Sequence, residues 1–373
     1  MRYCQSCILP DTRPNLVIDD SGFCNAAGMA AKNRIDWKER EARLHELVAK
    51  VKALNATYDC IIPVSGGKDS TWQTLTALEL GLNPLCVTWR TPARTKLGQK
   101  NLDNLISLGV NHVDLSINPE VERRFTRLAF ERFGNPLIPM HMAMHATALQ
   151  FALNFKVPLI IWGENSSYEY GGPDELNGVR LNHAWLKKFG VTQGTTSEDW
   201  VSSELTRKEL APYRWPSDEE QEELGIHAIF LGYYLRWDPV HVEGVSRKHG
   251  FKSADVPKTG HYDFADIDDE FLITVHHWMK WYKFGFTRLW DNLSLEIRAE
   301  RMTRDEAISL LTDTQEREPT EAIAKFCEYV GEQRSWYDEV VDRFRNRTIW
   351  EQNSEGQWRI PEFLVPDWDW SIA

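Results

Sequence analysis

The segment that most constrains the fold is a short apolar run that leads directly into a glycine-rich turn. Residues 60–64 are apolar, the hexapeptide Ser65-Gly66-Gly67-Lys68-Asp69-Ser70 follows, and apolar residues at helical spacing begin at Trp72. This order predicts a buried strand, a loop that binds an anion, and a helix whose first amides point at that anion. Gly66 and Gly67 have no Cβ, so their amides can close on a phosphate. A tight turn before an ordinary helix is the simpler alternative.

The side chains of this loop suit the phosphates of a nucleotide. Ser65 and Ser70 would donate hydroxyl hydrogen bonds, Lys68 would supply a cation, and Asp69 would hold a magnesium ion. The spacing differs from the common mononucleotide loop, G-x-x-x-x-G-K-[ST]. It resembles the S-G-G-x-D-S pyrophosphate loop of the ATP pyrophosphatases, which cleave ATP between the α- and β-phosphates and adenylate an oxygen of a second substrate. The resemblance implies ATP and magnesium as ligands.

Strand and helix patterns alternate through the first half of the chain. The expected strands are 60–64, 84–89, 112–115 and 159–162, and the expected helices are 36–54, 70–80, 96–108, 121–133 and 140–155. This alternation predicts an α/β protein with a doubly wound parallel sheet. Ligands of such sheets bind beyond the carboxyl ends of the strands. We therefore expect Thr88, Trp89, Gly163, Glu164 and Asn165 to lie on the same edge as the loop.

The composition of the chain changes along its length and suggests three regions. Residues 1–35 form a loop-like segment with three cysteines, and residues 36–258 hold the expected nucleotide-binding domain. Within that domain, a polar stretch at about 166–230 has few strand signals, and we interpret it as an insertion near the active site. Residues 259–373 carry helical patterns and end in a proline-broken apolar tail, which we expect to pack as an extended strap.

The balance of charges argues against nucleic acid as a partner. Lys+Arg 43 against Asp+Glu 55 in 373 residues gives a net charge of −12, although a local basic groove remains open. No apolar run of about 18 residues predicts a membrane span, and the N-terminus lacks the apolar core of a signal peptide. Six cysteines without a secretion signal favour reduced thiols. These features predict a cytoplasmic protein.

Several segments beyond the loop resemble the N-acetyl sugar amidotransferase family, which acts in bacterial surface-polysaccharide and nonulosonic-acid pathways. They occur in order between residues 1 and about 310. The segments are Tyr3-Cys4-Gln5-Ser6-Cys7, Pro10-Asp11-Thr12-Arg13-Pro14, Pro63–Ser70, Trp162-Gly163-Glu164-Asn165, Tyr168-Glu169-Tyr170-Gly171-Gly172, Leu231-Gly232-Tyr233-Tyr234, Lys283-Phe284-Gly285-Phe286 and Ile297–Ala307. The resemblance implies that ATP and ammonia convert the acetamido group of a sugar, free or nucleotide-linked, into an acetamidino group.

Residues after the fourth expected strand are candidates for contact with the sugar. Glu164 and Asn165 would position the acetamido group or accept a proton from ammonia. A structural carboxylate at a helix N-terminus is the alternative for Glu164. Tyr168, Glu169 and Tyr170 would also contact the substrate, and a surface turn before Gly171-Gly172 is their alternative.

The source of ammonia is expected to be another protein. Removal of Met1 does not expose Cys4, and no other cysteine lies in a glycine-rich elbow that would make it a glutaminase nucleophile. The resemblance implies separate glutaminase and cyclase-like subunits, similar to those of imidazole glycerol phosphate synthase. The chain alone should then use ammonium salts and not glutamine.

The N-terminal cysteines resemble a zinc knuckle with one ligand missing. Cys4, Cys7 and Cys24 have suitable spacing, but the family pattern expects a fourth cysteine at position 27, which is Ala27 here. Structural zinc usually takes four ligands, so a metal-free loop with free thiols is the alternative. His141 and His145 are also spaced for chelation on an expected helix. Helix packing is the simpler interpretation of that pair.

Two other functions are compatible with the loop. Some tRNA-thiolating enzymes combine it with C-x-x-C cysteines, but the net charge opposes tRNA binding, and Cys60 and Cys86 look like buried strand residues without a catalytic role. A non-enzymatic scaffold for a glutaminase is the second alternative, and the intact Ser65–Ser70 loop argues against it.

Overall fold

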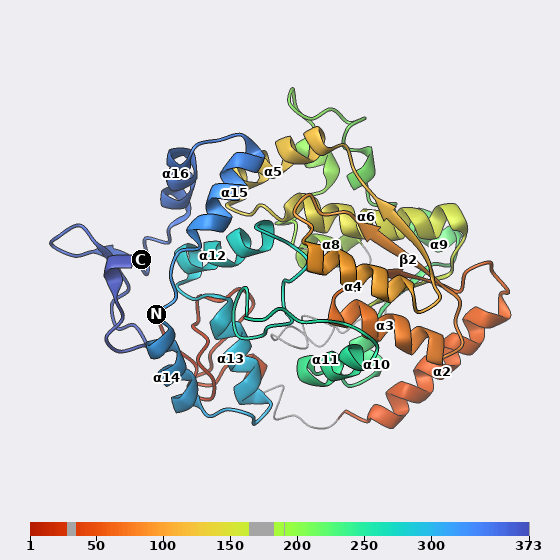
Figure 1. Ribbon diagram of the computed structural model, residues 1–373, viewed down its shortest axis with the longest axis horizontal. Helices are drawn as coiled ribbons and strands as arrows, with labels where there is room; N and C mark the ends of the chain where they lie inside the picture. The colour runs from red at the N-terminus through yellow and green to blue at the C-terminus, as the bar shows by residue number, and fades with distance from the viewer. Residues whose placement is uncertain (28–34, 164–182, 190, 373) are drawn as a thin grey trace.

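A five-stranded parallel sheet forms the centre of the α/β part of the protein. The computed structural model describes residues 1–27, 35–163, 183–189 and 191–372 (Figure 1). The strands are β1 (Cys60–Pro63), β2 (Pro84–Trp89), β3 (Asn111–Leu115), β4 (Leu159–Trp162) and β5 (His227–Phe230), in the order β3-β2-β1-β4-β5. All neighbouring pairs are parallel. The predicted α/β fold with a parallel sheet is confirmed.

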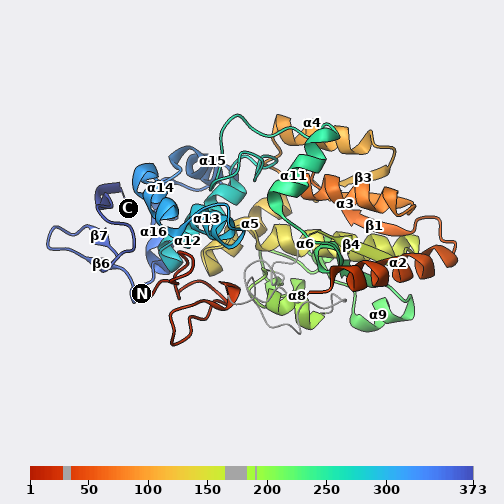
Figure 2. The same ribbon diagram turned by 90° about the horizontal axis from the view of Figure 1, so that it is seen from below.

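Helices cover both faces of this sheet, as a doubly wound fold requires. Helices α3 (Lys68–Glu79) and α11 (Pro239–Lys248) lie on one side of the sheet, and α6 (Ile138–Phe155) lies on the other (Figure 1); Figure 2 gives the view turned by 90°. Neighbouring strand residues alternate between two cores, since Ile61 and Ile160 pack with one and Ile62 and Ile161 with the other. The first core includes helices α5 (Pro119–Phe133) and α6 (Ile138–Phe155). The second includes α2 (Trp37–Ala53), α3 (Lys68–Glu79), α4 (Lys96–Ile106), α10 (Leu231–Tyr234) and α11 (Pro239–Lys248).

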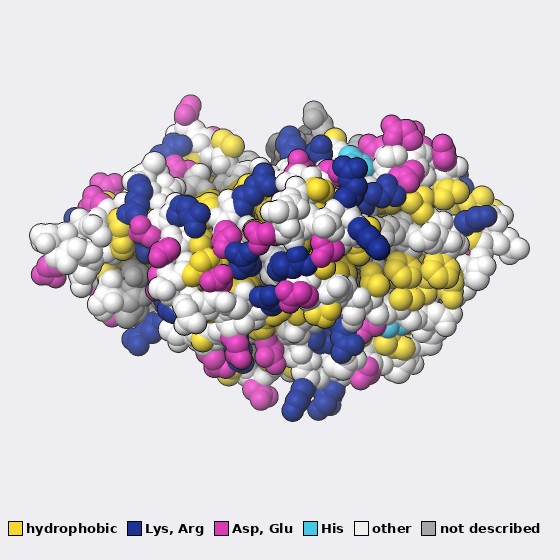
Figure 3. All heavy atoms as spheres, turned by 90° about the horizontal axis from the view of Figure 1, so that it is seen from above, with side chains coloured by type: hydrophobic (Ala, Val, Ile, Leu, Met, Phe, Trp, Pro, Cys, Tyr) yellow, Lys and Arg dark blue, Asp and Glu magenta, His cyan; other side chains and the backbone are white. Residues whose placement is uncertain are grey.

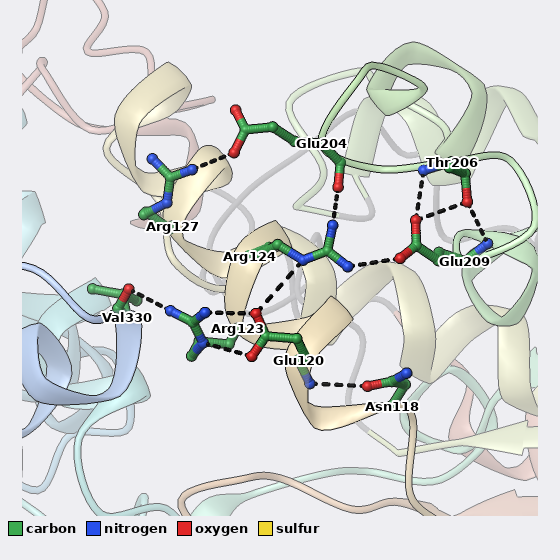
Figure 4. Close-up of polar contacts among 9 residues, drawn as sticks. All are labelled: Asn118, Glu120, Arg123, Arg124, Arg127, Glu204, Thr206, Glu209 and Val330. Carbon is green, nitrogen blue, oxygen red and sulfur yellow. Dashed lines mark hydrogen bonds and ion pairs between the residues drawn. The ribbon is translucent and has the colours of Figure 1, made fainter.

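Helix α5 connects the sheet to the two parts of the chain that follow it. Three of its arginines, Arg123, Arg124 and Arg127, reach outward in different directions (Figure 4). Arg123 donates to the carbonyl of Val330, at 3.0 Å, whereas Arg124 donates to the Glu204 carbonyl and lies 2.6 Å from Glu209.

Viewed from above, basic and acidic side chains are interspersed over the central part of the surface (Figure 3). That face therefore lacks a continuous basic stripe.

The stretch expected as an insertion, 166–230, contributes a strand of its own. Its described part contains α8 (His183–Phe189), two short 3-10 turns (Ser197–Trp200 and Ala211–Tyr213) and α9 (Asp218–Glu223). It ends in β5, which pairs with β4 along its whole length. Strand β5 has only four residues and follows the acid-rich helix α9, so its apolar run was too short to predict a strand. Residues 227–230 thus belong to the sheet, and the other predicted domain boundaries stay predictions.

The C-terminal region is helical, as predicted, and has a core of its own. Helices α12 (Leu272–Phe284), α13 (Arg288–Arg298), α14 (Arg304–Thr314), α15 (Thr320–Val330) and α16 (Arg334–Phe344) surround it. Helix α14 begins with a capping box formed by Thr303 and Glu306. A hairpin of β6 (Glu351–Gln352) and β7 (Trp358–Arg359) follows, and Trp368 of the tail packs on Trp281, with ring centroids 5.5 Å apart.

The N-terminal cysteine segment packs against this C-terminal region. The guanidinium of Arg13 lies 2.9 Å from Asp291 on α13, and Arg304 donates to the carbonyl of Cys7 at 3.0 Å. Ile8 is part of the C-terminal core. Both chain termini lie at this end of the molecule (Figure 1). Among the helices the structure describes, none combines the length and apolar character needed to cross a membrane.

Candidate active site

The predicted phosphate loop lies where the strand order reverses direction. The loop leaves β1, which pairs with β2 on one side and β4 on the other, so a crevice opens at the carboxyl ends of these strands. Two hydrogen bonds fix Val64, the residue just before the loop. Val64 donates its amide to the Val87 carbonyl at 2.8 Å, and the Thr88 hydroxyl donates to the Val64 carbonyl at 2.6 Å. Thr88 thus holds the loop in place, in addition to lining the crevice.

Gly66 gives the loop a shape that other residues would not allow. Gly66 has φ of +86°, and a Cβ there would lie 2.5 Å from the amide nitrogen of Leu102 in α4. Gly67 caps α3 and donates its amide to the Ser65 hydroxyl at 3.3 Å, while Ser70 donates to the Gly67 carbonyl at 3.1 Å. The amides of the first turn of α3 have no partner within the helix. This backbone cradle fits a phosphate group.

Lys68 and Asp69 place opposite charges together at the start of α3. The Lys68 ammonium is buried, 2.6 Å from Asp69, and faces the rings of Trp237 and Phe264 at 5.2 and 5.4 Å. Trp237 also donates its indole N–H to Asp69 at 2.9 Å. Asp69 therefore offers a fixed carboxylate, of the type that magnesium prefers, beside a cation that suits phosphate. The side chains fit the predicted ATP and magnesium.

A cavity of about 410 Å³ opens beside the loop and is lined by six of the nine residues predicted for the nucleotide site that the structure describes; Gly66, Gly67 and Lys68 do not line it. Ser65, Asp69, Ser70, Thr88, Trp89 and Gly163 all line it. Gly163 follows β4, and a Cβ there would lie 1.9 Å from the side-chain nitrogen of Gln73. Five other predicted residues lie outside the described residues, and their roles stay predictions. They are Glu164, Asn165, Tyr168, Glu169 and Tyr170.

Two carboxylates that the sequence did not indicate also line the cavity. Asp268 and Asp269 precede α12 and belong to the C-terminal region. Asp269 accepts from the Thr91 hydroxyl at 2.9 Å and from the amides of Phe271 and Ile273, so it fixes the start of α12. Burial raises the pKa of Asp269 to about 6 and also raises that of Asp268. These contacts join residues far apart in sequence, so no local pattern could have found them.

The cavity wall at the end of β4 is built from uncharged polar side chains. Gln73 on α3, His145 and Thr147 on α6, and Trp162 at the end of β4 all line the cavity and are buried. The ring of His145 lies 4.7 Å from that of Trp162. Burial lowers the pKa of His145 to about 3, so its imidazole is neutral near pH 7. Among the described residues the predicted His141–His145 pair belongs to no group with metal-ligand geometry.

The three N-terminal cysteines come together as predicted. The sulfur atoms of Cys4, Cys7 and Cys24 all lie within 4.8 Å of one another and are buried. Backbone amides of Cys7 and Cys24 donate to the Cys4 sulfur at 3.4 and 3.3 Å. Hydrogen bonds from Cys24 and Cys7 lower the pKa of the Cys4 thiol. Ala27 donates its amide to the Cys24 sulfur and supplies no fourth ligand. The cluster fits three ligands of a zinc ion.

Comparison with known proteins links the C-terminal region to one family. Residues 258–364 match a family model described as "LPS biosynthesis protein WbpG-like, C-terminal domain". Among curated proteins, none matches the chain.

Similar solved structures share little sequence with this chain. One is described as a predicted subunit of tRNA methyltransferase from Methanocaldococcus jannaschii (15% identity, 50% of this chain and 75% of that chain, TM-score 0.28). The NMN synthetase of Francisella tularensis (16%, 60% and 99%, 0.27) and the NAD+ synthetase of Burkholderia pseudomallei (11%, 60% and 91%, 0.28) are others. Because these TM-scores are low, the fold assignment rests on the strand order and the loop.

Proposed function

We propose that this protein is an ATP-dependent amidotransferase of lipopolysaccharide biosynthesis. In this proposal it converts the acetamido group of a sugar, free or nucleotide-linked, into an acetamidino group and releases AMP and pyrophosphate. The observation that carries the proposal is the joint construction of one cavity. The phosphate loop supplies one side, and Asp268 and Asp269, from the region that matches the WbpG-like family model, supply another.

The chemistry requires activation of an unreactive amide. The amide oxygen attacks the α-phosphorus of ATP, the bond from that phosphorus to the bridging oxygen breaks, and pyrophosphate leaves as the amide nitrogen loses its proton. Ammonia then adds to the amide carbon, and the carbon–oxygen bond breaks to release AMP. Such a transfer needs positioning and neutralisation of charge more than a protein nucleophile.

The residues of the loop are arranged for those tasks. The amides of Gly66, Gly67 and the first turn of α3 would hold the departing pyrophosphate, with Ser65 and Ser70 as hydroxyl donors. Lys68 would neutralise its charge, and Asp69 would hold a magnesium ion, which would supply further positive charge to the leaving pyrophosphate. The buried Lys68 has little freedom, so its ammonium is already in place.

The cysteines favour this reaction over thiolation of tRNA. Burial raises the pKa of the Cys60 and Cys86 thiols, and neither is among the described residues that line the cavity. A protonated, buried thiol is a poor sulfur carrier. We further propose that ammonia comes from a separate glutaminase that acts with a cyclase-like subunit.

The proposal is tested by supplying the purified chain with ATP, magnesium and ammonium, together with a panel of acetamido sugars. Mass spectrometry should detect replacement of one oxygen by NH, with release of AMP and pyrophosphate. Glutamine alone should give no product. Lys68→Gln should abolish turnover, whereas Lys100→Gln, on the exposed side of α4, should retain it. Binding of ATP without conversion of any sugar would refute the proposed reaction.

A further inference from the structure

The cavity wall at the end of β4 contains polar atoms that lack hydrogen-bond partners among the described residues. Within the described part of the chain, no partner lies near Gln73 Oε1, His145 Nδ1, Thr147 Oγ1 or Trp162 Nε1. All four side chains line the cavity and are at most 9% exposed. A buried polar atom without a partner costs about 1–3 kcal/mol. Four of them on one wall indicate a surface that is completed by a ligand.

These side chains meet at the end of β4, next to the loop. Gln73 follows Asp69 by one helical turn on α3, so both side chains project on the same side of the helix. The amide of Gln73 reaches across the backbone of Gly163, where a Cβ would lie 1.9 Å from its nitrogen. His145 and Trp162 lie beside it, with ring centroids 4.7 Å apart. A group bound here would lie between the loop and the aromatic wall.

The chemistry of the wall selects the kind of group that fits. Gln73 Oε1 only accepts hydrogen bonds, whereas Trp162 Nε1 only donates them. A ligand that satisfies both must carry a donor and an acceptor. A carboxylate has no donor, and no cationic side chain is among Gln73, His145, Thr147 and Trp162 to balance its charge. A neutral amide has both groups, and its methyl would pack against the indole and imidazole rings.

We propose that Gln73, His145 and Trp162 form the subsite for the acetamido group of the acceptor, with Gln73 Oε1 accepting the amide N–H. This assignment rests on the proposed amidotransferase function. An amide that donates its N–H shifts electron density towards its carbonyl oxygen. Gln73 thereby increases the nucleophilicity of the oxygen that attacks ATP, and it also orients that oxygen towards the loop.

The test compares an acetamido sugar that the wild-type protein converts with the O-acetyl analogue of the same sugar. The analogue has nearly the same shape but no N–H. The wild type should bind the acetamido sugar roughly tenfold more tightly than the analogue, which corresponds to one hydrogen bond. Gln73→Met should remove most of this preference, raise KM for the acetamido sugar and leave ATP affinity unchanged. Gln150→Met, on α6 outside the cavity, is the matched control and should keep the preference.

A second variant protects the test against misfolding of the first. Gly163→Ala would place a methyl against the Gln73 amide and displace it, so it should reduce the preference in the same direction. If Gln73→Met retains the full preference for the N–H group, the subsite assignment is wrong even though the amidotransferase reaction stands. If the wild type binds ATP but converts no acetamido sugar, the reaction and the subsite are both rejected.

Discussion

Substitution of Gly66 by alanine separates the shape of the phosphate loop from its chemistry. The substitution adds one methyl and changes no charge or hydrogen-bonding group. A Cβ at this position would lie 2.5 Å from the amide nitrogen of Leu102, and ordinary contacts begin near 3.4 Å. The loop and α4 would therefore have to separate by about 0.9 Å. Since the clash involves backbone atoms of a helix, rotation of a side chain cannot relieve it.

The expected loss of stability has two parts. Alanine at φ of +86° is strained by about 1–2 kcal/mol, and forcing apart two packed backbones costs a further 1–3 kcal/mol or so. Gly109→Ala supplies the control, because Gly109 has φ of +98° and a methyl added there would meet no described atom within 4 Å. It lies just before β3, at the amino-terminal edge of the parallel sheet, whereas the loop lies at the carboxyl-terminal edge. The control should lose only the strain energy and keep full activity.

Urea denaturation and kinetics of AMP release measure the two effects. Gly66→Ala should lose about 1–3 kcal/mol more than Gly109→Ala in the free energy of unfolding. A displacement near 1 Å should also lower kcat/KM for ATP by roughly a hundredfold. Equal stability losses in the two variants, with normal ATP kinetics in both, would show that the loop does not depend on its close approach to α4.

Three further predictions test single side chains. Asp69→Asn should lower the rate of pyrophosphate release at saturating magnesium by at least roughly a hundredfold, because it weakens the proposed metal ligand. An unchanged rate would exclude Asp69 as a magnesium ligand. Asp103→Asn, on α4, is the control. Burial raises the pKa of Glu122 from 4.5 to about 8, so the folded protein keeps it neutral while the unfolded chain ionises. The wild type should therefore lose stability as the pH rises from about 4.5 to 8. The free energy of unfolding of Glu122→Gln, relative to wild type, should increase over that range by up to roughly 4 kcal/mol. Urea denaturation of both proteins at pH 5 and pH 8 measures this difference, and an equal difference at the two pH values would contradict the prediction. Purified wild type should contain close to one equivalent of zinc by metal analysis, and Cys4→Ser should lose it; wild type with far less zinc would rule the site out.

The sequence predicted those strands well whose burial on both faces produces a continuous apolar run. Strands β1, β2 and β4 are apolar runs because both of their faces are covered by helices. Strand β5 was missed because its four residues follow the acidic helix α9. Within the region where helical patterns were predicted from residue 259 onward, α12 begins only at Leu272, because the carboxylate of Asp269 accepts the amides of Phe271 and Ile273 at its start.

The candidate site was predictable at the loop and at the neighbouring strand ends, where Thr88, Trp89 and Gly163 line the cavity, and not where the C-terminal region reaches it. Ser65–Ser70 form one continuous segment, so their spacing alone indicates a phosphate site. Asp268 reaches the same cavity only through tertiary contacts, since its carbonyl accepts the Thr95 amide at 3.1 Å. Gln73 has no unusual sequence context, and it became a candidate only because its side-chain oxygen is buried without a partner among the described residues.

The contacts of Asp268 and Asp269 link the phosphate loop, where the proposed reaction with ATP would occur, to the C-terminal region, which would help to select the acceptor sugar. The chain leaving β2 pairs with the segment before α12: Glu270 donates its amide to the Ala93 carbonyl at 2.7 Å, and Thr91 donates to Asp269. A shift of the C-terminal region would therefore move the carboxyl end of β2. That end also positions the phosphate loop, because Thr88 hydrogen-bonds the Val64 carbonyl. Function depends on such sites and not on the fold alone. In the proposed reaction, the phosphate loop would account for attack on ATP, and the walls built by α6 and the C-terminal region would account for the choice of acceptor.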